Sequence, residues 1–144
     1  IFYTQKIKTY AAHILVNAEG RGEQYIMATN TYLVEVTKIV DGDTIYGHLI
    51  LEDFDIVLRN EKFRFLGVNT PERNQKGYRE ATDFTASICS GKTLRVDLHG
   101  KDAFGRRLVD VYYQEGELTK SLNEELLRLE LAVVYKHWGG INND

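Results

Sequence analysis

A hairpin pattern in the first half of the chain places the strongest constraint on the fold. Residues 32–40 are rich in β-branched side chains, and Val34 and Val36 fall on one face of the strand that they predict. The next residues, Asp41-Gly42-Asp43, have the composition of a tight turn, and residues 44–51 read as a second strand. The two strands are expected to pair, so the chain must build a β-sheet.

Further strands are expected at residues 55–58, 62–68, 93–98 and 108–113. Polar turns are predicted at residues 59–61 and 100–105, and the sheet pattern stops at Pro71.

Two helices interrupt the strands. Apolar residues recur at helical spacing before Gly91, a natural stop, at Ala81, Phe84, Ile88 and Cys89. A second helix is expected to begin near Ser121, which is placed to form a capping box with Glu124. Its apolar face consists of Leu122, Leu126, Leu127 and Leu129.

Short antiparallel strands must protect their edges, and closing into a barrel is one way to do so. We therefore predict a β-rich α+β fold for residues 31–144, a five-stranded barrel with two packed helices. Periodicity alone would also fit other α+β arrangements. Residues 1–30 differ in composition and are expected to be an extension of one or two short strands, and the tail from Leu131 to Asp144 is expected to fray.

The formal net charge of −3 argues against a protein that grips duplex DNA through a broadly basic surface. A local basic cleft is still compatible with this charge. No apolar run approaches the roughly 20 residues of a membrane helix, and no signal-peptide pattern opens the chain, so localisation stays open. The single cysteine, Cys89, is expected in the core.

Three clusters of polar residues are candidates for chemistry. Asp41-Gly42-Asp43-Thr44 is an oxygen-rich turn of the kind that suits calcium, or an ordinary Asp-Gly turn. Arg64 lies in an apolar strand, and Asn69, Thr70 and Glu72 lie at the end of that strand. This pattern is typical of a binding loop supported by the strand, but it also fits a solvent-facing arginine followed by a proline turn. Arg106 and Arg107, beside a glycine, can reach a phosphate with forked donors, or belong to a solvated hairpin.

Taken together, the three clusters favour phosphodiester hydrolysis. A cation and arginines neutralise the charge that develops in the transition state. Glu72 is suited to orient or deprotonate a water.

The motifs VDGDT, FRFLGVNTPE and AFGR occur in this order, with EATDFT in a helix between the last two. Over residues 32–135 the chain resembles the staphylococcal nuclease (thermonuclease) family. The resemblance implies an OB-fold β-barrel and calcium-dependent cleavage of DNA and RNA. By this resemblance Asp43 is a metal ligand, Asp41 is an acid just outside the metal shell, and Thr70 directs its main-chain carbonyl at the metal. Arg64 contacts the phosphate, Glu72 is the proposed general base, and Arg106 acts on the side of the leaving group.

Several positions depart from the family pattern. Asn69 stands where the family usually has a second metal-binding aspartate. The amide oxygen is retained, but the lost charge costs on the order of a few kcal/mol at an effective dielectric of about 20, so we predict weaker calcium binding. Where the family places tyrosines beside the nucleotide base, this chain has residues 135–138, and Trp138 either stacks on a base or packs in the fold. A family glycine of the second helix is replaced by Glu130.

Two functions remain. The first is a calcium-dependent nuclease that favours single-stranded DNA or RNA, which the joint presence of Arg64, Glu72 and Arg106 supports. The second is a catalytically impaired module that binds nucleic acid or protein on the same barrel, which Asn69 and the acidic net charge support.

Overall fold

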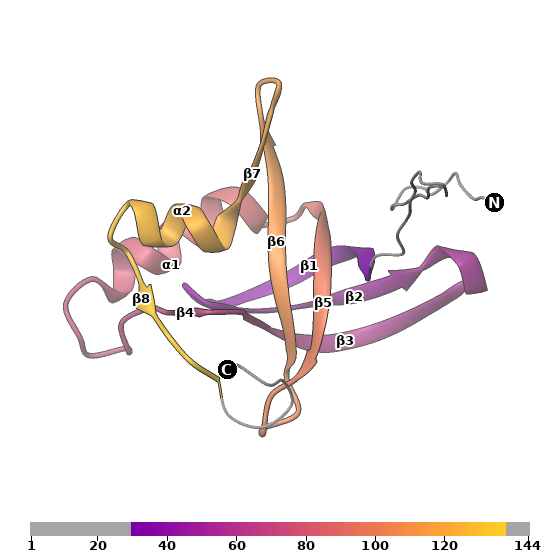
Figure 1. Cartoon of the computed structure of the whole chain (residues 1–144), viewed down its shortest axis with the longest axis horizontal. Helices are drawn as coiled ribbons and strands as arrows, with labels where there is room; N and C mark the ends of the chain where they lie inside the picture. The colour runs from indigo at the N-terminus through magenta and orange to yellow at the C-terminus, as the bar shows by residue number, and fades with distance from the viewer. Residues whose placement is uncertain (1–29, 138–144) are drawn as a thin grey trace, which may run out of the picture. The chain divides into compact units, whose positions relative to one another are not determined.

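A computed structural model describes residues 30–137 of the chain (Figure 1). The strands are β1 (Thr31–Asp41), β2 (Thr44–Leu51), β3 (Ile56–Phe65), β4 (Val68–Asn69), β5 (Thr93–Lys101), β6 (Arg107–Glu115), β7 (Leu118–Ser121) and β8 (Val133–Val134). The helices are α1 (Tyr78–Cys89), α2 (Leu122–Arg128) and a short 3₁₀ turn at Glu52–Phe54. The strands expected before residue 30 lie outside the described residues. The chain divides into two compact units, Ile1–Tyr32 and Leu33–Asp144, and the site described below lies in the second.

Five strands close into a barrel, which confirms the predicted fold. Hydrogen bonds join the strands in the order β3-β2-β1-β5-β6-β7, and β3 also pairs with β6. This last pairing is parallel, with Phe63 opposite Arg107 and Phe65 opposite Val109, and it closes the sheet on itself. Strand β7 extends the far end of β6 as a hairpin that projects beyond the barrel in Figure 1.

Apolar side chains from each of the five barrel strands fill the interior. The fully buried ones are Val34, Ile45, Leu49, Phe63, Phe65, Val96, Val109 and Val111, whereas Leu108, also fully buried, pairs with Arg64 on the opposite face. Because successive side chains of a strand point to opposite faces, Arg64 points away from the interior that receives Phe63 and Phe65. Arg64 is nevertheless buried, so other segments must cover it from outside the barrel.

The helices follow the predicted pattern with small differences. In α1 the buried residues are Ala81, Thr85 and Cys89, which confirms the core position of the cysteine. The Oγ of Ser121 accepts the N–H of Glu124 at 3.1 Å, one half of the predicted capping box. Neither helix of residues 30–137 has the length and apolar character that crossing a membrane requires.

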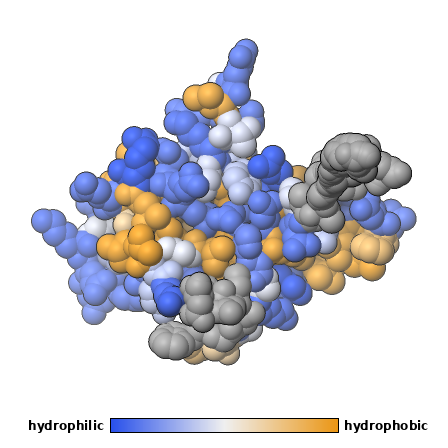
Figure 2. Space-filling view, viewed as in Figure 1, coloured by the Kyte–Doolittle hydropathy of each residue, from blue (hydrophilic) through white to orange (hydrophobic). Residues whose placement is uncertain are grey.

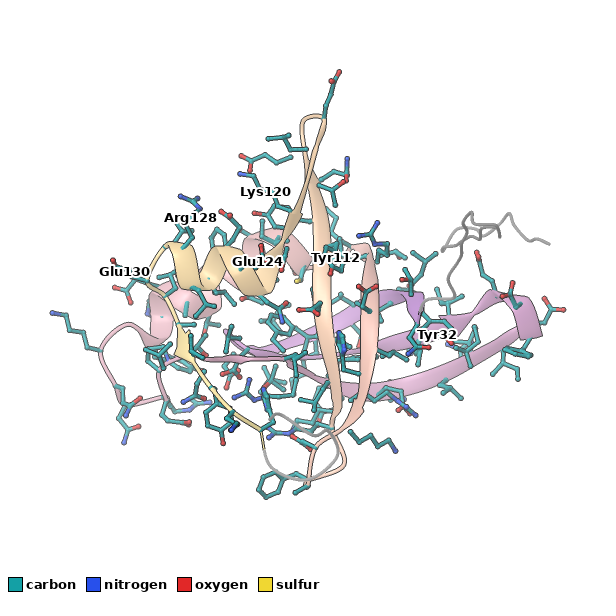
Figure 3. The ribbon with its side chains drawn as sticks, viewed as in Figure 1. Tyr32, Tyr112, Lys120, Glu124, Arg128 and Glu130 are labelled. Carbon is teal, nitrogen blue, oxygen red and sulfur yellow. The ribbon has the colours of Figure 1, made fainter. Side chains whose placement is uncertain are left out.

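The second helix ends earlier than the family pattern implied. It ends at Arg128, with Leu129 as its C-cap, and Glu130 adopts a left-handed φ of 61° just past the end. The N–H groups of Glu130 and Leu131 donate to the carbonyls of Leu127 and Leu126, which is the hydrogen bonding of a Schellman motif. Glu130 is therefore the residue after the helix, not a residue inside it. Figure 3 shows Arg128 pointing outward from α2 and Glu130 at the turn.

Three predictions of local structure are wrong. The strand expected at residues 62–68 is interrupted, because β3 ends at Phe65 and a turn through Gly67, with a φ of 80°, precedes β4. The polar turn expected at residues 59–61 is absent, because β3 runs unbroken through it. Asn60 has a φ of 60° and forms a bulge, where the register with β2 shifts between Gly47 and Leu49, and its N–H donates to Nδ1 of His48 at 3.1 Å. The tail does not fray between residues 131 and 137, because β8 pairs with β4.

Exposed apolar side chains gather in two places. One lies at the outer end of the β2–β3 hairpin, which includes Phe54, Ile56 and Val57, and the other is β8, with Val133 and Val134. Figure 2 shows the orange of the hairpin end at the right.

Candidate active site

The turn between β1 and β2 is pressed against two other segments. A Cβ placed on Gly42 would lie 2.8 Å from Cγ2 of Thr70 and 2.9 Å from Cβ of Ala81. The Oγ1 of Thr85, in α1, donates a hydrogen bond of 2.7 Å to the carbonyl of Gly42. Only a glycine allows this close approach, and the approach fixes the flanking aspartates.

Asp43 is a buried carboxylate with several donors. Its Oδ1 accepts the hydroxyl of Thr44 at 2.9 Å, and its Oδ2 accepts both the N–H and the hydroxyl of Thr70 at 2.9 and 3.0 Å. Burial would raise the pKa of Asp43, but the charge of Arg64 and the Thr70 N–H outweigh it and lower the pKa. The carboxylate is therefore held ionised.

Asp41 lies next to this carboxylate in a less favourable environment. Its Oδ1 accepts the N–H of Asp43 at 3.2 Å. Burial, followed by the negative charge of Asp43, raises the pKa of Asp41 to about 6. Two carboxylates thus lie close together in a partly buried place, an arrangement that a bound cation would stabilise.

Arg64 is 4 % exposed and makes a fixed set of hydrogen bonds. Its Nη1 donates to the carbonyls of Phe65 and Val68 at 3.0 and 2.7 Å, and its Nη2 donates to Oδ1 of Asn69 at 3.0 Å. A guanidinium has five N–H groups, so the Nε–H and one Nη2–H remain. Burial lowers the pKa of Arg64, whereas Asp43, with Oδ2 3.6 Å from Nη1, acts in the opposite direction.

Arg106 is held on the β5–β6 turn by Asp102. The Oδ2 of Asp102 accepts the Nε of Arg106 at 2.8 Å, and its Oδ1 accepts the N–H groups of Phe104 and Arg106. Burial would raise the pKa of Asp102, but these hydrogen bonds lower it. The charge of Arg106 in turn contributes to lowering the pKa of Arg64, so the two guanidinium groups act on each other across the site.

Two further predicted residues, Arg107 and Glu72, lie outside this contact network. Arg107 forms an ion pair with Glu61 at 2.6 Å. Glu72 is exposed in the loop after Thr70; its N–H donates to Oε1 of Gln75 at 2.7 Å, and its carboxylate enters none of the ion pairs found among residues 30–137. Trp138 lies outside the described residues.

The structure also gives contacts to residues that received no role from the sequence. Asp102 belongs to the candidate turn that carries Arg106 and Arg107, and an aspartate four residues before an arginine is a local signal for the pairing seen here. The ring of Tyr135 lies 5.4 Å from Cζ of Arg64, and His137 is buried beside it. Thr85 is the last residue of the motif EATDFT, but the motif by itself did not indicate its contact with the hairpin.

The donors at the hairpin have the chemistry that a hard cation prefers. They are the carboxylates of Asp41 and Asp43 and the amide oxygen of Asn69. Among residues 30–137 no three histidine, cysteine, aspartate or glutamate side chains form a group suited to a metal. A calcium ion here would therefore depend on amide, main-chain and water oxygens beside the aspartate pair, which fits calcium but not zinc.

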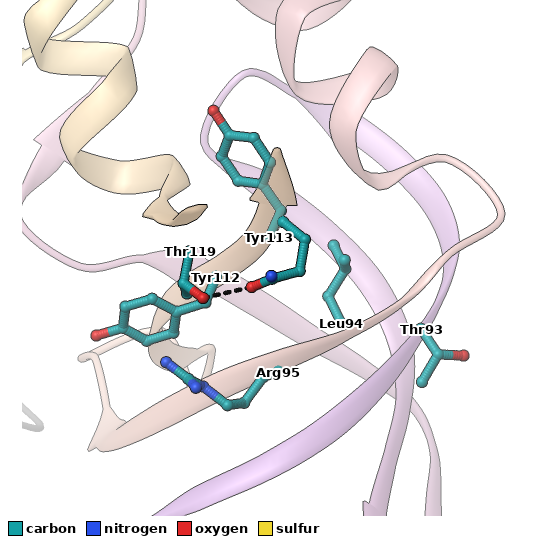
Figure 4. Close-up of a pocket in the computed structure, with 7 residues that line it drawn as sticks. Thr93, Leu94, Arg95, Tyr112, Tyr113 and Thr119 are labelled. Atoms are coloured by element: carbon teal, nitrogen blue, oxygen red, sulfur yellow. Dashed lines mark hydrogen bonds between the residues drawn. The ribbon is translucent and has the colours of Figure 1, made fainter. Parts of the chain in front are cut away.

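A shallow pocket of about 150 Å³ lies elsewhere, against β5, β6 and β7. Figure 4 shows Tyr112, Arg95 and Thr119 among its walls; the Arg95 guanidinium lies 4.4 Å from the Tyr112 ring, and the Thr119 hydroxyl donates to Gln114. None of the predicted site residues lines this pocket.

Comparison with known proteins places the chain in a family. Residues 62–144, more than half of the chain, match the family described as staphylococcal nuclease homologue. A protein of Escherichia coli O157:H7 named an uncharacterized endonuclease is 30% identical over 103 residues, which cover 72% of this chain and 61% of the relative.

Two further relatives carry similar names. An uncharacterized endonuclease of Haemophilus influenzae is 28% identical over 72% of this chain and 52% of its own length. A probable endonuclease of Colletotrichum graminicola is 26% identical over 97% of this chain and 59% of its own length. The chain thus spans between about half and three fifths of the length of these relatives. On the strength of the family match and of the barrel, the chain belongs to the staphylococcal nuclease family.

Proposed function

We propose that this chain is a calcium-dependent nuclease that hydrolyses phosphodiester bonds of DNA or RNA and favours single strands. The observation that carries the proposal is the contact between Arg64 and the hairpin acids. A buried arginine with two N–H groups to spare lies beside a pair of carboxylates, one ionised and one with a raised pKa. A phosphodiester complements the arginine, and a cation complements the pair of carboxylates.

The two arginines would bind the phosphate. The Nε–H and the remaining Nη2–H of Arg64 are suited to phosphate oxygens, and Arg106 brings a second positive charge that acts on Arg64. Two guanidinium groups that repel each other are stabilised by an anion between them. The same groups would neutralise the charge that grows on the phosphate and on the leaving oxygen in the transition state.

Calcium would be held by Asp43 and Thr70, with Asn69 and Asp41 contributing oxygens from the same hairpin and strand. When bound, it supplies positive charge that polarises the phosphate. The Asn69 oxygen already accepts a hydrogen bond from Arg64, which supports the prediction of weak calcium binding. Glu72, exposed next to Thr70 and Pro71, is proposed to orient or deprotonate the attacking water.

Two exposed aromatic rings support the preference for single strands. Tyr135 is 38% exposed beside Arg64, and Phe104 is 80% exposed with its ring 5.3 Å from Cζ of Arg106. Unpaired bases stack on such rings, whereas paired bases are already stacked on each other. We therefore propose that a single strand runs past both arginines, with its bases against the two rings.

The test is a cleavage assay on RNA and heat-denatured DNA with calcium or with chelator. The parent is expected to cleave only with calcium, and Glu72→Ala and Arg106→Ala to lose about 10²-fold or more in kcat. Arg128→Ala, on α2 and paired with Glu125, is the control and should stay near the parent. Chelator-resistant cleavage, or an equal loss in the Arg128 control, would contradict the assignment.

Asn69→Asp separates the nuclease from the impaired binding module. The added charge should tighten calcium binding and raise activity at low calcium. If neither the parent nor Asn69→Asp cleaves, while the parent still binds an oligonucleotide, the binding module is the function. The acidic net charge and the engaged Asn69 oxygen are what favour that second candidate.

A further inference from the structure

The segment after α2 returns to the site and covers the β3–β4 turn. Val133 pairs with Asn69 and Val134 with Val68. The N–H of Tyr135 then donates to the carbonyl of Gly67 at 2.9 Å. Figure 1 shows this yellow segment crossing β4 on its way from α2.

His137 makes the last contact of this segment. The residue is 5 % exposed, and its Nε2 accepts the N–H of Gly67 at 2.8 Å. Gly67 is therefore bound to the segment through both its carbonyl and its N–H. An imidazole that accepts through Nε2 must be neutral and carry its proton on Nδ1.

Tyr135 connects this histidine to the arginine of the site. The rings of His137 and Tyr135 meet edge to face, with centroids 4.9 Å apart and planes at 83°. The Tyr135 ring also lies 5.4 Å from Cζ of Arg64. A change in the position of His137 is thus passed to Arg64 through one aromatic ring.

The charged groups around His137 favour the neutral ring. Burial, followed by the positive charge of Arg64 on β3, lowers the pKa of His137, and Arg106 on the β5–β6 turn adds to this. The carboxylates of Asp102, on that turn, and of Asp43, on the β1–β2 hairpin, act in the opposite direction but do not prevail. A protonated ring would also direct an N–H at the N–H of Gly67.

We infer that His137 is a positioning residue, which as a neutral imidazole fixes residues 133–137 on Gly67 and holds the Tyr135 ring against Arg64. The inference rests on the proposed function in one respect, the role of Arg64 as a phosphate ligand. Loss of the hydrogen bond between His137 and Gly67 should leave the barrel folded and make the Arg64 guanidinium more mobile. The effect on catalysis should then appear in kcat more than in KM, because the transition state depends on the orientation of that group.

The experiment compares His137→Leu, which removes the acceptor, with His137→Gln, which keeps an acceptor of similar reach and does not titrate. His48→Leu is the matched control, because His48 also accepts a main-chain N–H, that of Asn60, on the β2–β3 hairpin. Amide exchange at Gly67 and the Nε–H signal of Arg64 are followed by NMR, and kcat and KM are measured with calcium and RNA between pH 5 and pH 8, a range of about three units around the ordinary histidine pKa.

In His137→Leu, Gly67 exchange should be about tenfold faster and kcat about tenfold lower, with KM within about twofold of the parent. His137→Gln should keep both and show a smaller fall in kcat from pH 8 to pH 5 than the parent, and the fall that remains comes from Asp41, whose pKa is about 6. His48→Leu should match the parent. Unchanged Gly67 exchange in His137→Leu, or an unchanged acid fall in His137→Gln, would overturn the inference. A parent without calcium-dependent cleavage defeats the proposed nuclease, and the Gly67 and Arg64 signals then decide the positioning role alone.

Discussion

Replacing Gly42 with alanine should destabilise the protein at the hairpin that carries the acids. The new Cβ would lie 2.8 and 2.9 Å from two atoms of Thr70 and 2.9 Å from Cβ of Ala81. Thr70 cannot rotate away without losing its hydrogen bond to Asp43, and Ala81 has no rotamer to change. Overpacking of this kind costs roughly 1–3 kcal/mol, and we expect the upper half of that range, about 2–3 kcal/mol.

The assay is urea unfolding followed by far-UV circular dichroism, in chelator so that metal binding does not contribute. For a domain of this size the loss corresponds to a fall in Tm of roughly 6–15 °C. Adding Ala81→Gly removes one of the clashing atoms, although glycine in a helix costs about 1 kcal/mol. The double variant should therefore be more stable than the sum of the single effects by at least about 0.5 kcal/mol.

Gly91→Ala provides the comparison. Gly91 has a φ of 71° and no atom within 4 Å of an added Cβ, so its cost of about 1–2 kcal/mol would come from backbone strain alone and should not respond to Ala81→Gly. The close packing of the hairpin is refuted if the free energy of unfolding of Gly42→Ala lies within about 0.5 kcal/mol of the parent's. It is also refuted if the losses caused by Gly42→Ala and Ala81→Gly add up in the double variant.

Three further predictions follow from single residues. Glu130→Gly should raise the free energy of unfolding by about 0.5–1 kcal/mol, because Glu130 has a left-handed φ, whereas Glu130→Ala should give no gain; urea unfolding decides. The raised pKa of Asp41, about 6 against an unfolded value of 3.8, means that the folded state binds more protons between these pH values. Its contribution to stability is present below pH 3.8 and lost as the pH rises through 6, so in chelator Asp41→Asn should be more stable than the parent at pH 7 and lose this pH dependence. Burial raises the pKa of Cys89 to about 12, so an aromatic disulfide reagent should label it only at the rate of unfolding; rapid labelling of the folded protein would contradict its position in α1.

Local signals in the sequence were sufficient to predict the two strands of the first hairpin. Alternation and an Asp-Gly turn fix β2 at Thr44–Leu51, as predicted. Composition gave a wrong prediction around Asn60. Three successive polar residues are typical of a turn, but here they form a bulge within the continuous strand β3. Strand β7 was not foreseen, since Leu118–Ser121 is short and follows a polar turn.

Contacts between distant segments could not be read from local patterns. The parallel pairing of Phe63 with Arg107 closes the barrel, and nothing in either strand alone specifies its partner. The same holds for β8, since Val133 and Val134 are ordered by pairing with β4 rather than by their own propensity. His137 was passed over for this reason: its role depends on Gly67, which is far away in the sequence.

The candidate site was predictable where motifs encode it. The order of the motifs indicated Asp43, Thr70 and Arg64 together, and the structure joins them by direct hydrogen bonds and an ion pair. It does not join Glu72 to them by a contact, so the general-base role stays a prediction.

The hairpin acids are proposed to form the cation site. NMR of the protein with Mn²⁺ in place of calcium tests this site, because both ions prefer oxygen ligands and a paramagnetic ion broadens the signals nearest to it. Broadening should begin at the amides of Asp43 and Thr70, and added calcium should reverse it. Broadening centred on another acidic pair, such as Asp97 and Asp110 on facing positions of β5 and β6, would contradict this proposal.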